Sequence, residues 1–185
     1  MQKNHKLVYI NGKTFEVLLT QTHIQARIRE LAWQIHQSYP QEQTIYLIGV
    51  LNGAFRFVAD LLTYFPQDRQ LCVDFTKISS YAGTYSTGEI HPIIGLKQGL
   101  KNKHVLLVED IIDTGLTIQY LTKQIQQQQP FSVKIATLLF KPQALRTSLQ
   151  PDFIGFEIEP LFVIGYGLDY NEQGRNLNDI YVLKD

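Results

Sequence analysis

The sequence contains a single cysteine, Cys72, among its 185 residues. One cysteine excludes an intramolecular disulfide framework and a zinc site built from several cysteines, so we expect Cys72 to be a small core residue. No apolar run approaches the roughly 18 residues of a membrane-spanning helix, and the run Leu7–Ile10 is too short for the apolar region of a signal peptide. These absences favour a cytoplasmic protein with no membrane partner.

Charge is also scarce and evenly balanced. The chain has 17 basic and 17 acidic residues, and charged residues make up 18% of it, below the roughly 25% of an average soluble domain. A net charge of zero argues against the broad basic surface that binds nucleic acid, so we predict no nucleic-acid partner. The length suits one domain, 1–185, and the 44% of apolar residues can supply its core.

Hydrophobic spacing predicts strands that alternate with helices. Asn11-Gly12 favours a hairpin turn between 7–10 and 14–19. Strands are then expected over 44–50, 71–79, 104–108 and 133–140, with helices carrying the apolar stripes of 24–35 and 57–65 and a third helix over 114–129. This order is typical of an α/β protein with a mainly parallel twisted sheet flanked by helices. Residues 81–89 suit either a mobile lid or an ordinary surface loop.

The run from Val105 to Thr117 places acidic residues between a predicted strand and a predicted helix. Glu109 and Asp110 are expected at the carboxyl end of the strand, where open α/β sheets bind ligands. Free N–H groups and hydroxyls at the start of the helix could hold a phosphate. Because carboxylates repel phosphate, a divalent cation and sugar hydroxyls are the natural mediators. The alternative is a solvated loop that caps a helix. The chain has neither a Walker A loop nor a dinucleotide fingerprint.

This run resembles the phosphoribosyl pyrophosphate (PRPP) signature of type I phosphoribosyltransferases, which is a hydrophobic strand, two acids, two aliphatic residues and Asp-Thr-Gly-x-Thr. Other segments resemble motifs of the branch that salvages 6-oxopurines, and they appear in the family's order. They are the pyrophosphate loop at 49–55, the start of the lid at 79–81, the purine-binding lysine at 140–142, a further segment at 151–157 and the base-binding hood at 162–172. The resemblance implies the type I phosphoribosyltransferase fold, with a hood formed by N-terminal residues and about 151–185, and a flexible lid.

The resemblance also implies roles on the PRPP side. Ribose and phosphate would be bound by Glu109, Asp110, Asp113, Thr114, Gly115, Leu116 and Thr117. Asp113 would in addition be catalytic, exchanging a proton with N7 of the purine. Pyrophosphate would be bound by Asn52, Gly53, Ser80, Tyr81 and Arg175. Mg²⁺ would be the cofactor: Glu109 and Asp110 would bind the ribose hydroxyls directly or through one Mg²⁺, and Asp169 would help to hold a second Mg²⁺ at the pyrophosphate.

On the base side the resemblance implies a purine site made of Lys141, Phe162, Val163 and Asp169. The Lys141 ammonium would donate to the 6-oxo group, whereas adenine presents an amino donor there and would leave two donors facing each other. Phe162 would stack on the base, and the backbone of Val163 would meet its Watson–Crick edge. Without the resemblance, Lys141 suits a solvated strand end and the pair Phe162-Val163 suits a core.

The activity implied is transfer of the 5-phosphoribosyl group from PRPP to N9 of hypoxanthine or guanine, by a homodimer or homotetramer. Two alternatives stay open: a regulatory protein that keeps the PRPP pocket without catalysis, and a transferase that prefers xanthine. The sequence departs from the family at two places. Asn52 stands where many members carry lysine, and 143–146 lacks the paired arginines of many bacterial members.

Overall fold

The computed structural model describes residues 7–80, 90–96 and 99–184, and the side chains of these residues except those of 79, 80 and 90–92. The described residues form two sheets and three α-helices. The helices are α1 (Gln21–Gln37), α2 (Phe55–Tyr64) and α3 (Leu116–Gln126). A short 3-10 helix, η1, spans Pro142–Ala144.

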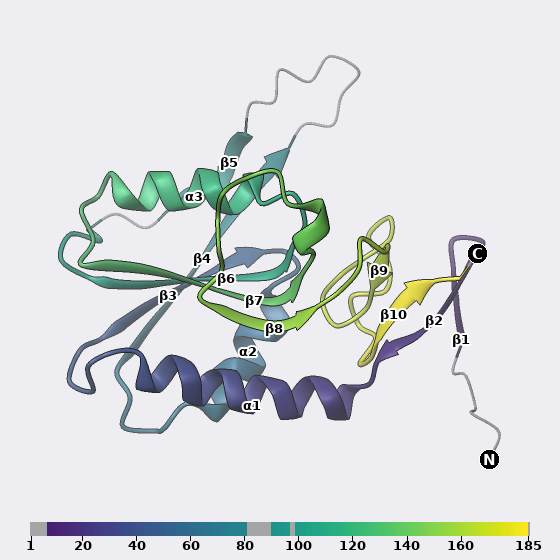
Figure 1. Cartoon of the computed structure of the whole chain (residues 1–185), viewed down its shortest axis with the longest axis horizontal. Helices are drawn as coiled ribbons and strands as arrows, with labels where there is room; N and C mark the ends of the chain where they lie inside the picture. The colour runs from purple at the N-terminus through teal and green to yellow at the C-terminus, as the bar shows by residue number, and fades with distance from the viewer. Residues whose placement is uncertain (1–6, 81–89, 97–98, 185) are drawn as a thin grey trace.

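The larger sheet has six strands in the order β5-β4-β3-β6-β7-β8, and its pairs are parallel except for the antiparallel pair β4–β5. Its strands are β3 (Ile45–Leu51), β4 (Leu71–Ser80), β5 (Ile90–Ile94), β6 (His104–Ile112), β7 (Ser132–Phe140) and β8 (Phe153–Glu157). Helices α1 and α2 cover one face of this sheet and α3 covers the other (Figure 1). The predicted mainly parallel α/β architecture is therefore confirmed.

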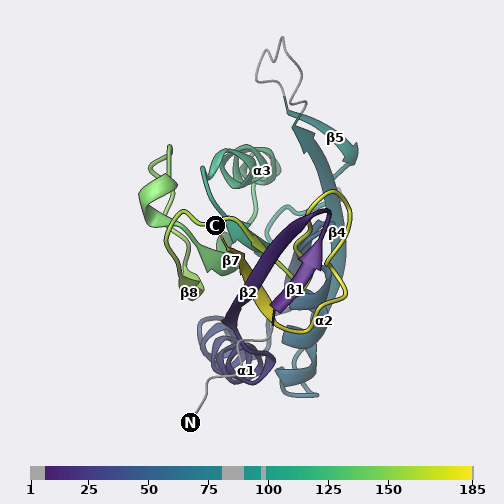
Figure 2. The ribbon, with the colours of Figure 1, turned by 90° about the vertical axis from the view of Figure 1, so that its right-hand side faces the viewer.

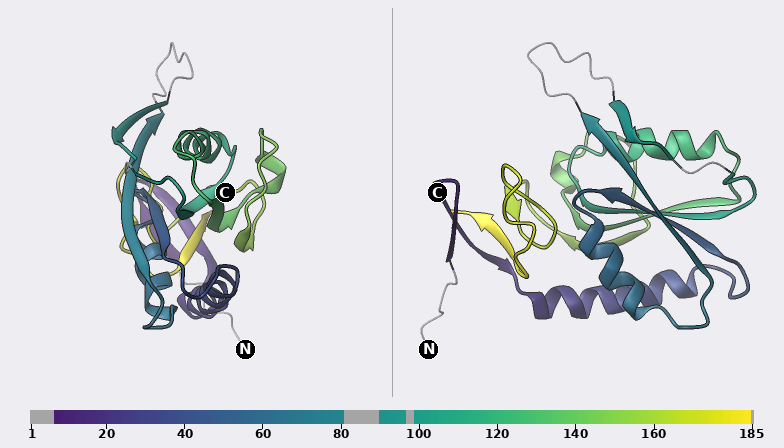
Figure 3. Two further views of the ribbon diagram at one scale, coloured as in Figure 1. Left: turned by 90° about the vertical axis from the view of Figure 1, so that its left-hand side faces the viewer. Right: turned by 180° about the vertical axis from the view of Figure 1, so that it is seen from behind.

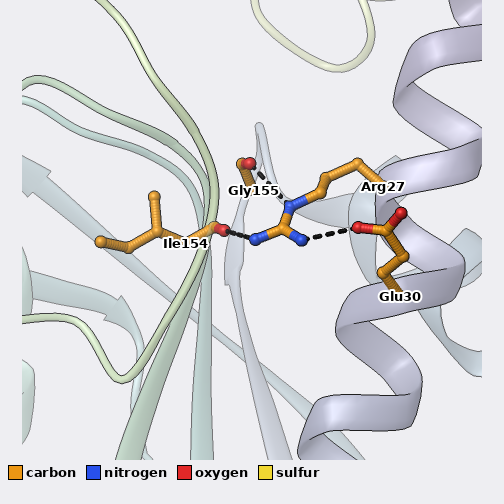
Figure 4. A network of polar contacts seen from close by, with 4 residues as sticks. All are labelled: Arg27, Glu30, Ile154 and Gly155. Atoms are coloured by element: carbon orange, nitrogen blue, oxygen red, sulfur yellow. Dashed lines mark hydrogen bonds and ion pairs between the residues drawn. The ribbon is translucent and has the colours of Figure 1, made fainter.

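Helix α1 shows how local sequence and packing combine. Thr20 caps it, since its hydroxyl accepts a hydrogen bond from the amide of His23. The stripe that predicted this helix is fully buried: Ile24, Ile28, Leu31, Ala32 and Ile35. Arg27 ties the helix to the edge strand β8, donating to the carbonyls of Gly155 at 2.9 Å and Ile154 at 2.7 Å, with Glu30 as ion-pair partner (Figure 4).

The smaller sheet is antiparallel, with the order β1-β2-β10-β9, and is called the hood sheet below. Its strands are β1 (Leu7–Ile10), β2 (Lys13–Leu19), β9 (Val163–Ile164) and β10 (Ile180–Leu183). The hairpin turn is confirmed, because Asn11 and Gly12 have φ angles of 49° and 74°. The hood sheet lies at one end of the molecule (Figures 2 and 3). Strand β8, within the segment expected to form the hood, pairs instead with β7 in the large sheet.

Three expectations from the sequence need correction. Strand β6 does not end at Val108 but continues to Ile112, because it stays paired with β7 as far as Phe140. The third helix spans Leu116–Gln126 rather than 114–129, since Gly115 has a φ of 79° and cannot be part of the helix. Cys72 is partly exposed on β4 and is not a core residue. None of the helices in the described part of the chain combines the length and apolar character needed to cross a bilayer.

Candidate active site

A pocket of about 310 Å³ lies where the carboxyl ends of β3 and β6 meet a loop of the C-terminal segment. Residues from four distant parts of the sequence line it together. The lining includes most of the predicted PRPP, pyrophosphate and metal residues: Asn52, Gly53, Glu109, Asp110, Asp113, Thr114, Gly115, Thr117, Asp169 and Arg175. The geometry therefore gathers one polar, oxygen-rich site from motifs that the sequence presents separately.

The turn into α3 forms an amide-lined cradle. The first helical hydrogen bond runs from the amide of Gln119 to the carbonyl of Gly115 at 2.9 Å, so the amides before it precede the hydrogen-bonded ladder and can face an anion. A Cβ on Gly115 would lie 2.6 Å from the Thr147 hydroxyl, which means that the segment after β7 braces the turn. Leu116 is 47% exposed and does not line the pocket; its predicted contribution is a backbone amide.

Glu109 and Asp110 are buried inside β6 rather than placed on a solvated loop. They are 6% and 8% exposed. Burial raises the pKa of Glu109 well above its usual range, and the neighbouring charge of Asp110 adds to this. Burial also raises the pKa of Asp110, while Arg175 acts in the opposite direction. The amide of Ile111 already donates to Oδ1 of Asp110 at 2.8 Å, so burial disfavours the charge of Glu109 more than that of Asp110.

The acidic pair fits a magnesium ion that is shared with a ligand. Oε2 of Glu109 is buried and has no hydrogen-bond partner among the described residues, so a cation or a sugar hydroxyl would satisfy it. Carboxylate oxygens are the ligands that Mg²⁺ prefers, and Mg²⁺ is usually completed by water and substrate phosphates. In the described part of the chain no cluster of three or more His, Cys, Asp or Glu could hold a metal by itself. A metal here would therefore be bound together with substrate.

The predicted pyrophosphate loop, 49–55, packs between the acidic strand and the C-terminal segment. The peptide bond between Leu51 and Asn52 is cis. A Cβ on Gly53 would lie 1.5 Å from Oδ2 of Asp110, and a Cβ on Gly167 would lie 2.2 Å from the carbonyl oxygen of Gly53. Both glycines are thus required by close approach of the backbone, and residue 53 cannot carry a side chain without displacing Asp110.

Asp169 and Arg175 form an ion pair in the lining of this pocket. Nη2 of Arg175 lies 2.5 Å from Oδ1 of Asp169. The other guanidinium nitrogen, Nη1, donates to the carbonyl of Gly167 at 2.6 Å. Arg175 is therefore held beside the acidic site, where it can face an anionic ligand.

Lys141 comes from the carboxyl end of β7 and reaches the acidic turn after β6. Its Nζ lies 2.7 Å from Oδ2 of Asp113. Lys141 is 7% exposed, so it is not the solvated strand end that the sequence alone would suggest. Its amide donates to the carbonyl of Ile112 at 2.9 Å, which fixes the end of β7 against β6. The predicted base-binding lysine and the predicted proton acceptor are thus in direct contact.

Phe162 and Val163 lie at the free edge of the hood sheet. The amide of Leu183 donates to the carbonyl of Phe162 at 3.0 Å, so the next pair, Val182–Val163, is the non-hydrogen-bonded type. The backbone N–H and C=O of Val163 consequently point away from β10 and are available to a ligand. The ring of Phe162 is 45% exposed and rests on Phe15 and Tyr170, with ring centroids 6.3 and 5.6 Å away.

Two predicted residues are not placed by this geometry. The side chain of Ser80 and the whole of Tyr81 lie outside the described residues. Val50, Ile78 and Ile118 form apolar walls of the pocket and were not anticipated as site residues. The spacing of these apolar residues predicts only that they are packed in the protein, because a position on a pocket wall depends on the tertiary arrangement.

Comparison with known proteins agrees with this site. The family model for the phosphoribosyl transferase domain matches residues 16–171, so the chain belongs to the phosphoribosyltransferase family. The chain is 40% identical over 177 residues to a hypoxanthine-guanine phosphoribosyltransferase of Aquifex aeolicus, with 95% of this chain and 98% of the relative covered. It is 42% identical over 170 residues to the Bacillus subtilis enzyme of the same name, with 91% and 93% covered.

Solved structures give the same result. A hypoxanthine phosphoribosyltransferase of Staphylococcus aureus has a TM-score of 0.85 at 40% identity, with 91% of each chain covered. A hypoxanthine-guanine phosphoribosyltransferase of Bacillus anthracis, solved with a HEPES molecule in its active site, has a TM-score of 0.84 at 34% identity and covers 91% of this chain and 98% of its own. The predicted type I phosphoribosyltransferase fold is confirmed.

Proposed function

We propose that this enzyme transfers the 5-phosphoribosyl group from PRPP to N9 of hypoxanthine or guanine, forming inosine or guanosine monophosphate and pyrophosphate in purine salvage. The observation that carries the proposal is a pocket that joins an acidic pair to an amide-lined turn, with Lys141 in contact with Asp113, one of the residues that line this pocket. The similarity to hypoxanthine-guanine enzymes over most of the chain supports the same substrates.

The PRPP half of the site follows from the charges and amides in the pocket. The amides and hydroxyls of 113–117 bind the 5′-phosphate, and Glu109 and Asp110 accept hydrogen bonds from the ribose hydroxyls. Asn52, Gly53, Ser80, Tyr81 and Arg175 bind pyrophosphate. Glu109 and Asp110 would hold one Mg²⁺ together with the ribose hydroxyls of PRPP, and Asp169 would help to hold a second one at the pyrophosphate. The metal would supply positive charge against the charge that builds on the leaving group.

The purine half follows from the contact between Lys141 and Asp113. As the base enters, the ammonium of Lys141 donates to the 6-oxo group, and Asp113 accepts the proton that leaves N7. The bond from ribose C1 to pyrophosphate breaks, and the bond from C1 to N9 forms. Phe162 stacks on the base and the free backbone of Val163 binds its Watson–Crick edge. Adenine is rejected because its amino group would face the lysine donor.

The proposal is tested by turnover with four bases. Purified protein with Mg²⁺ and PRPP should form the monophosphates of hypoxanthine and guanine and release pyrophosphate, whereas adenine should be inert. Faster turnover of xanthine would identify a xanthine enzyme instead, and tight PRPP binding without product would identify a regulatory protein. Equal turnover of adenine would contradict the role given to Lys141.

A substitution at Asp113 tests the proton transfer. Asp113→Asn should lower kcat more than it weakens PRPP binding, because it removes the proton acceptor and keeps most of the cradle. Measurement of kcat together with PRPP affinity by calorimetry separates the two effects. An unchanged kcat would exclude Asp113 as the acceptor.

We further propose that residues 1–185 act as one domain in which the hood sheet closes over the base, and that the enzyme works in the cytoplasm as a homodimer or homotetramer. The support is the membership of the phosphoribosyltransferase family. Light scattering at working concentration tests the assembly, and a monomer would contradict it.

A further inference from the structure

Helix α2 holds the loop that carries Asp169 and Arg175. Residues 165–179 connect β9 to β10 and are called the hood loop. Two side chains of α2, Arg56 and Asp60, lie one helical turn apart and therefore face the same direction. Both contact Tyr166, which is 1% exposed and is among the largest fully buried side chains of the described residues. A polar side chain so deeply buried needs a specific partner.

Tyr166 is gripped at both its ring and its hydroxyl. The hydroxyl donates to Oδ2 of Asp60, and the side-chain amide of Gln25 donates to the same oxygen. The guanidinium carbon of Arg56 lies 4.8 Å from the centroid of the Tyr166 ring. Burial, then the bond to Asp60 and its charge, raise the pKa of Tyr166, so its hydroxyl stays a donor. Arg56 also donates to the carbonyl of Leu177 at 2.6 Å, at the other end of the hood loop.

Tyr166 is adjacent in sequence to Gly167, which contacts the residues of the proposed pyrophosphate site. Gly167 follows Tyr166, packs directly on the backbone of Gly53, and accepts the 2.6 Å hydrogen bond from Arg175. The amide of Tyr166 donates to the carbonyl of Leu177 at 2.9 Å, the acceptor that Arg56 also uses. A movement of Tyr166 would therefore move the acceptor of Arg175 and the surface against which Gly53 rests.

The same helix begins at the pyrophosphate loop. The loop ends at Gly53, and α2 starts at Phe55. One rigid element thus supports both walls of the proposed pyrophosphate site: its first turn continues from the loop, and its side chains fix the hood loop opposite. No other helix of the described residues has both connections. This arrangement would keep the anion-binding groups at a constant separation before substrate arrives, which lowers the cost of ordering them on binding.

We propose that Arg56, Asp60 and Tyr166 are positioning residues for the pyrophosphate end of PRPP, acting through Gly167 on Gly53 and Arg175. The inference rests on the proposed function for the identity of the ligand. None of these three residues contacts the substrate in this proposal. Their loss should weaken binding of the leaving group and leave binding of the purine nucleotide largely unchanged.

The test compares Tyr166→Phe with Tyr64→Phe. Tyr64 belongs to the same network, since its hydroxyl donates to Oε1 of Gln25 at 2.9 Å, but among the described residues its polar and cation–π partners are Gln25 and Arg29, which lie outside the hood loop. Tyr166→Phe should raise the KM for PRPP and the calorimetric Kd for magnesium pyrophosphate about ten-fold. This factor is the lower end of the range expected for loss of a hydrogen bond to a charged group. The Kd for inosine monophosphate should change less than about two-fold. Tyr64→Phe should leave all three values unchanged.

A second pair of variants tests the hydrogen bond without relying on Tyr166. Both donors reach the same oxygen of Asp60, so Asp60→Asn keeps an acceptor for them, whereas Asp60→Ala removes it. Asp60→Asn should retain pyrophosphate affinity within about three-fold, and Asp60→Ala should reproduce Tyr166→Phe. A purely structural role would lower thermal stability in both tyrosine variants without separating pyrophosphate from nucleotide binding, and that result would overturn the inference.

Failure of the proposed function would look different. If the wild-type protein makes no nucleotide from PRPP and a 6-oxopurine, the proposed activity is wrong, whatever the variants do. If the wild type is active but Tyr166→Phe folds and binds magnesium pyrophosphate as tightly as wild type, the positioning role is wrong and the activity stands. Equal weakening of pyrophosphate and inosine monophosphate binding would likewise reject positioning of the leaving group.

Discussion

Replacing Glu109 with glutamine should stabilise the ligand-free protein above neutral pH and remove most of its activity. Glu109 is 6% exposed, and its Oε2 has no hydrogen-bond partner among the described residues. Burial, with the charge of Asp110, raises the pKa of Glu109, so the ionised carboxylate is unfavourable until a ligand compensates it. Glutamine keeps the shape, carries no charge and can donate a hydrogen bond to Asp110.

The size of the effect follows from the cost of an unpartnered buried group, about 1–3 kcal/mol. For a chain of this length, 1 kcal/mol moves Tm by about 2–4 °C, so the expected increase at about pH 8 is roughly 2–12 °C. The sign of the pH dependence is fixed by the raised pKa. Below the unfolded pKa of about 4.3 the carboxyl is protonated in both states, and the wild type loses stability as pH rises through the folded pKa.

The assay is thermal denaturation of Glu109→Gln and wild type at about pH 4.5 and pH 8, with Glu42→Gln as control. Glu42 is exposed, so the same chemical change should leave Tm unaltered. The kcat/KM for PRPP of Glu109→Gln should fall by about 10–100-fold, since charge-assisted contacts to ribose and metal are lost. A variant less stable than wild type at pH 8, or a Tm difference that does not grow with pH, would refute the reasoning.

Three further predictions follow from the same geometry. Lys141→Gln should raise the KM for hypoxanthine by about 10–100-fold and leave the KM for PRPP within about two-fold; steady-state kinetics with each substrate varied checks this, and a rise confined to PRPP would contradict it. Gly53→Ala should abolish measurable turnover, because the new Cβ would lie 1.5 Å from Oδ2 of Asp110, whereas Gly95→Ala, which meets nothing within 4 Å, should be fully active. Burial lowers the pKa of His104, so its contribution to stability is present above about pH 6.5 and is lost as pH falls through the folded pKa. Urea denaturation at about pH 7.5 and pH 5.5 should show a larger loss of unfolding free energy for wild type than for His104→Gln. Equal losses would exclude this residue as the cause.

Local sequence patterns were enough to predict the structural elements that depend on a short stretch of chain. Asn11-Gly12 predicts its turn because few other pairs adopt two positive φ angles, and the apolar stripe of α1 predicts the buried face that is observed. The acidic turn with Gly115 also predicts a phosphate site from sequence, since its amides and carboxylates are adjacent in the chain, and these residues line one pocket. These features depend on spacing within one element.

The sequence by itself determined the alternation of strands and helices and the chemical groups of the PRPP site, because both are encoded by neighbouring residues. Only the tertiary structure decided that Glu109 and Asp110 are buried within β6, since that depends on continued pairing with β7. It also brought Lys141 to Asp113 and Tyr166 to Asp60. Such contacts join residues that are far apart in the chain, and their partners are set by the order of strands in the sheet and by the packing of α2 against the hood loop.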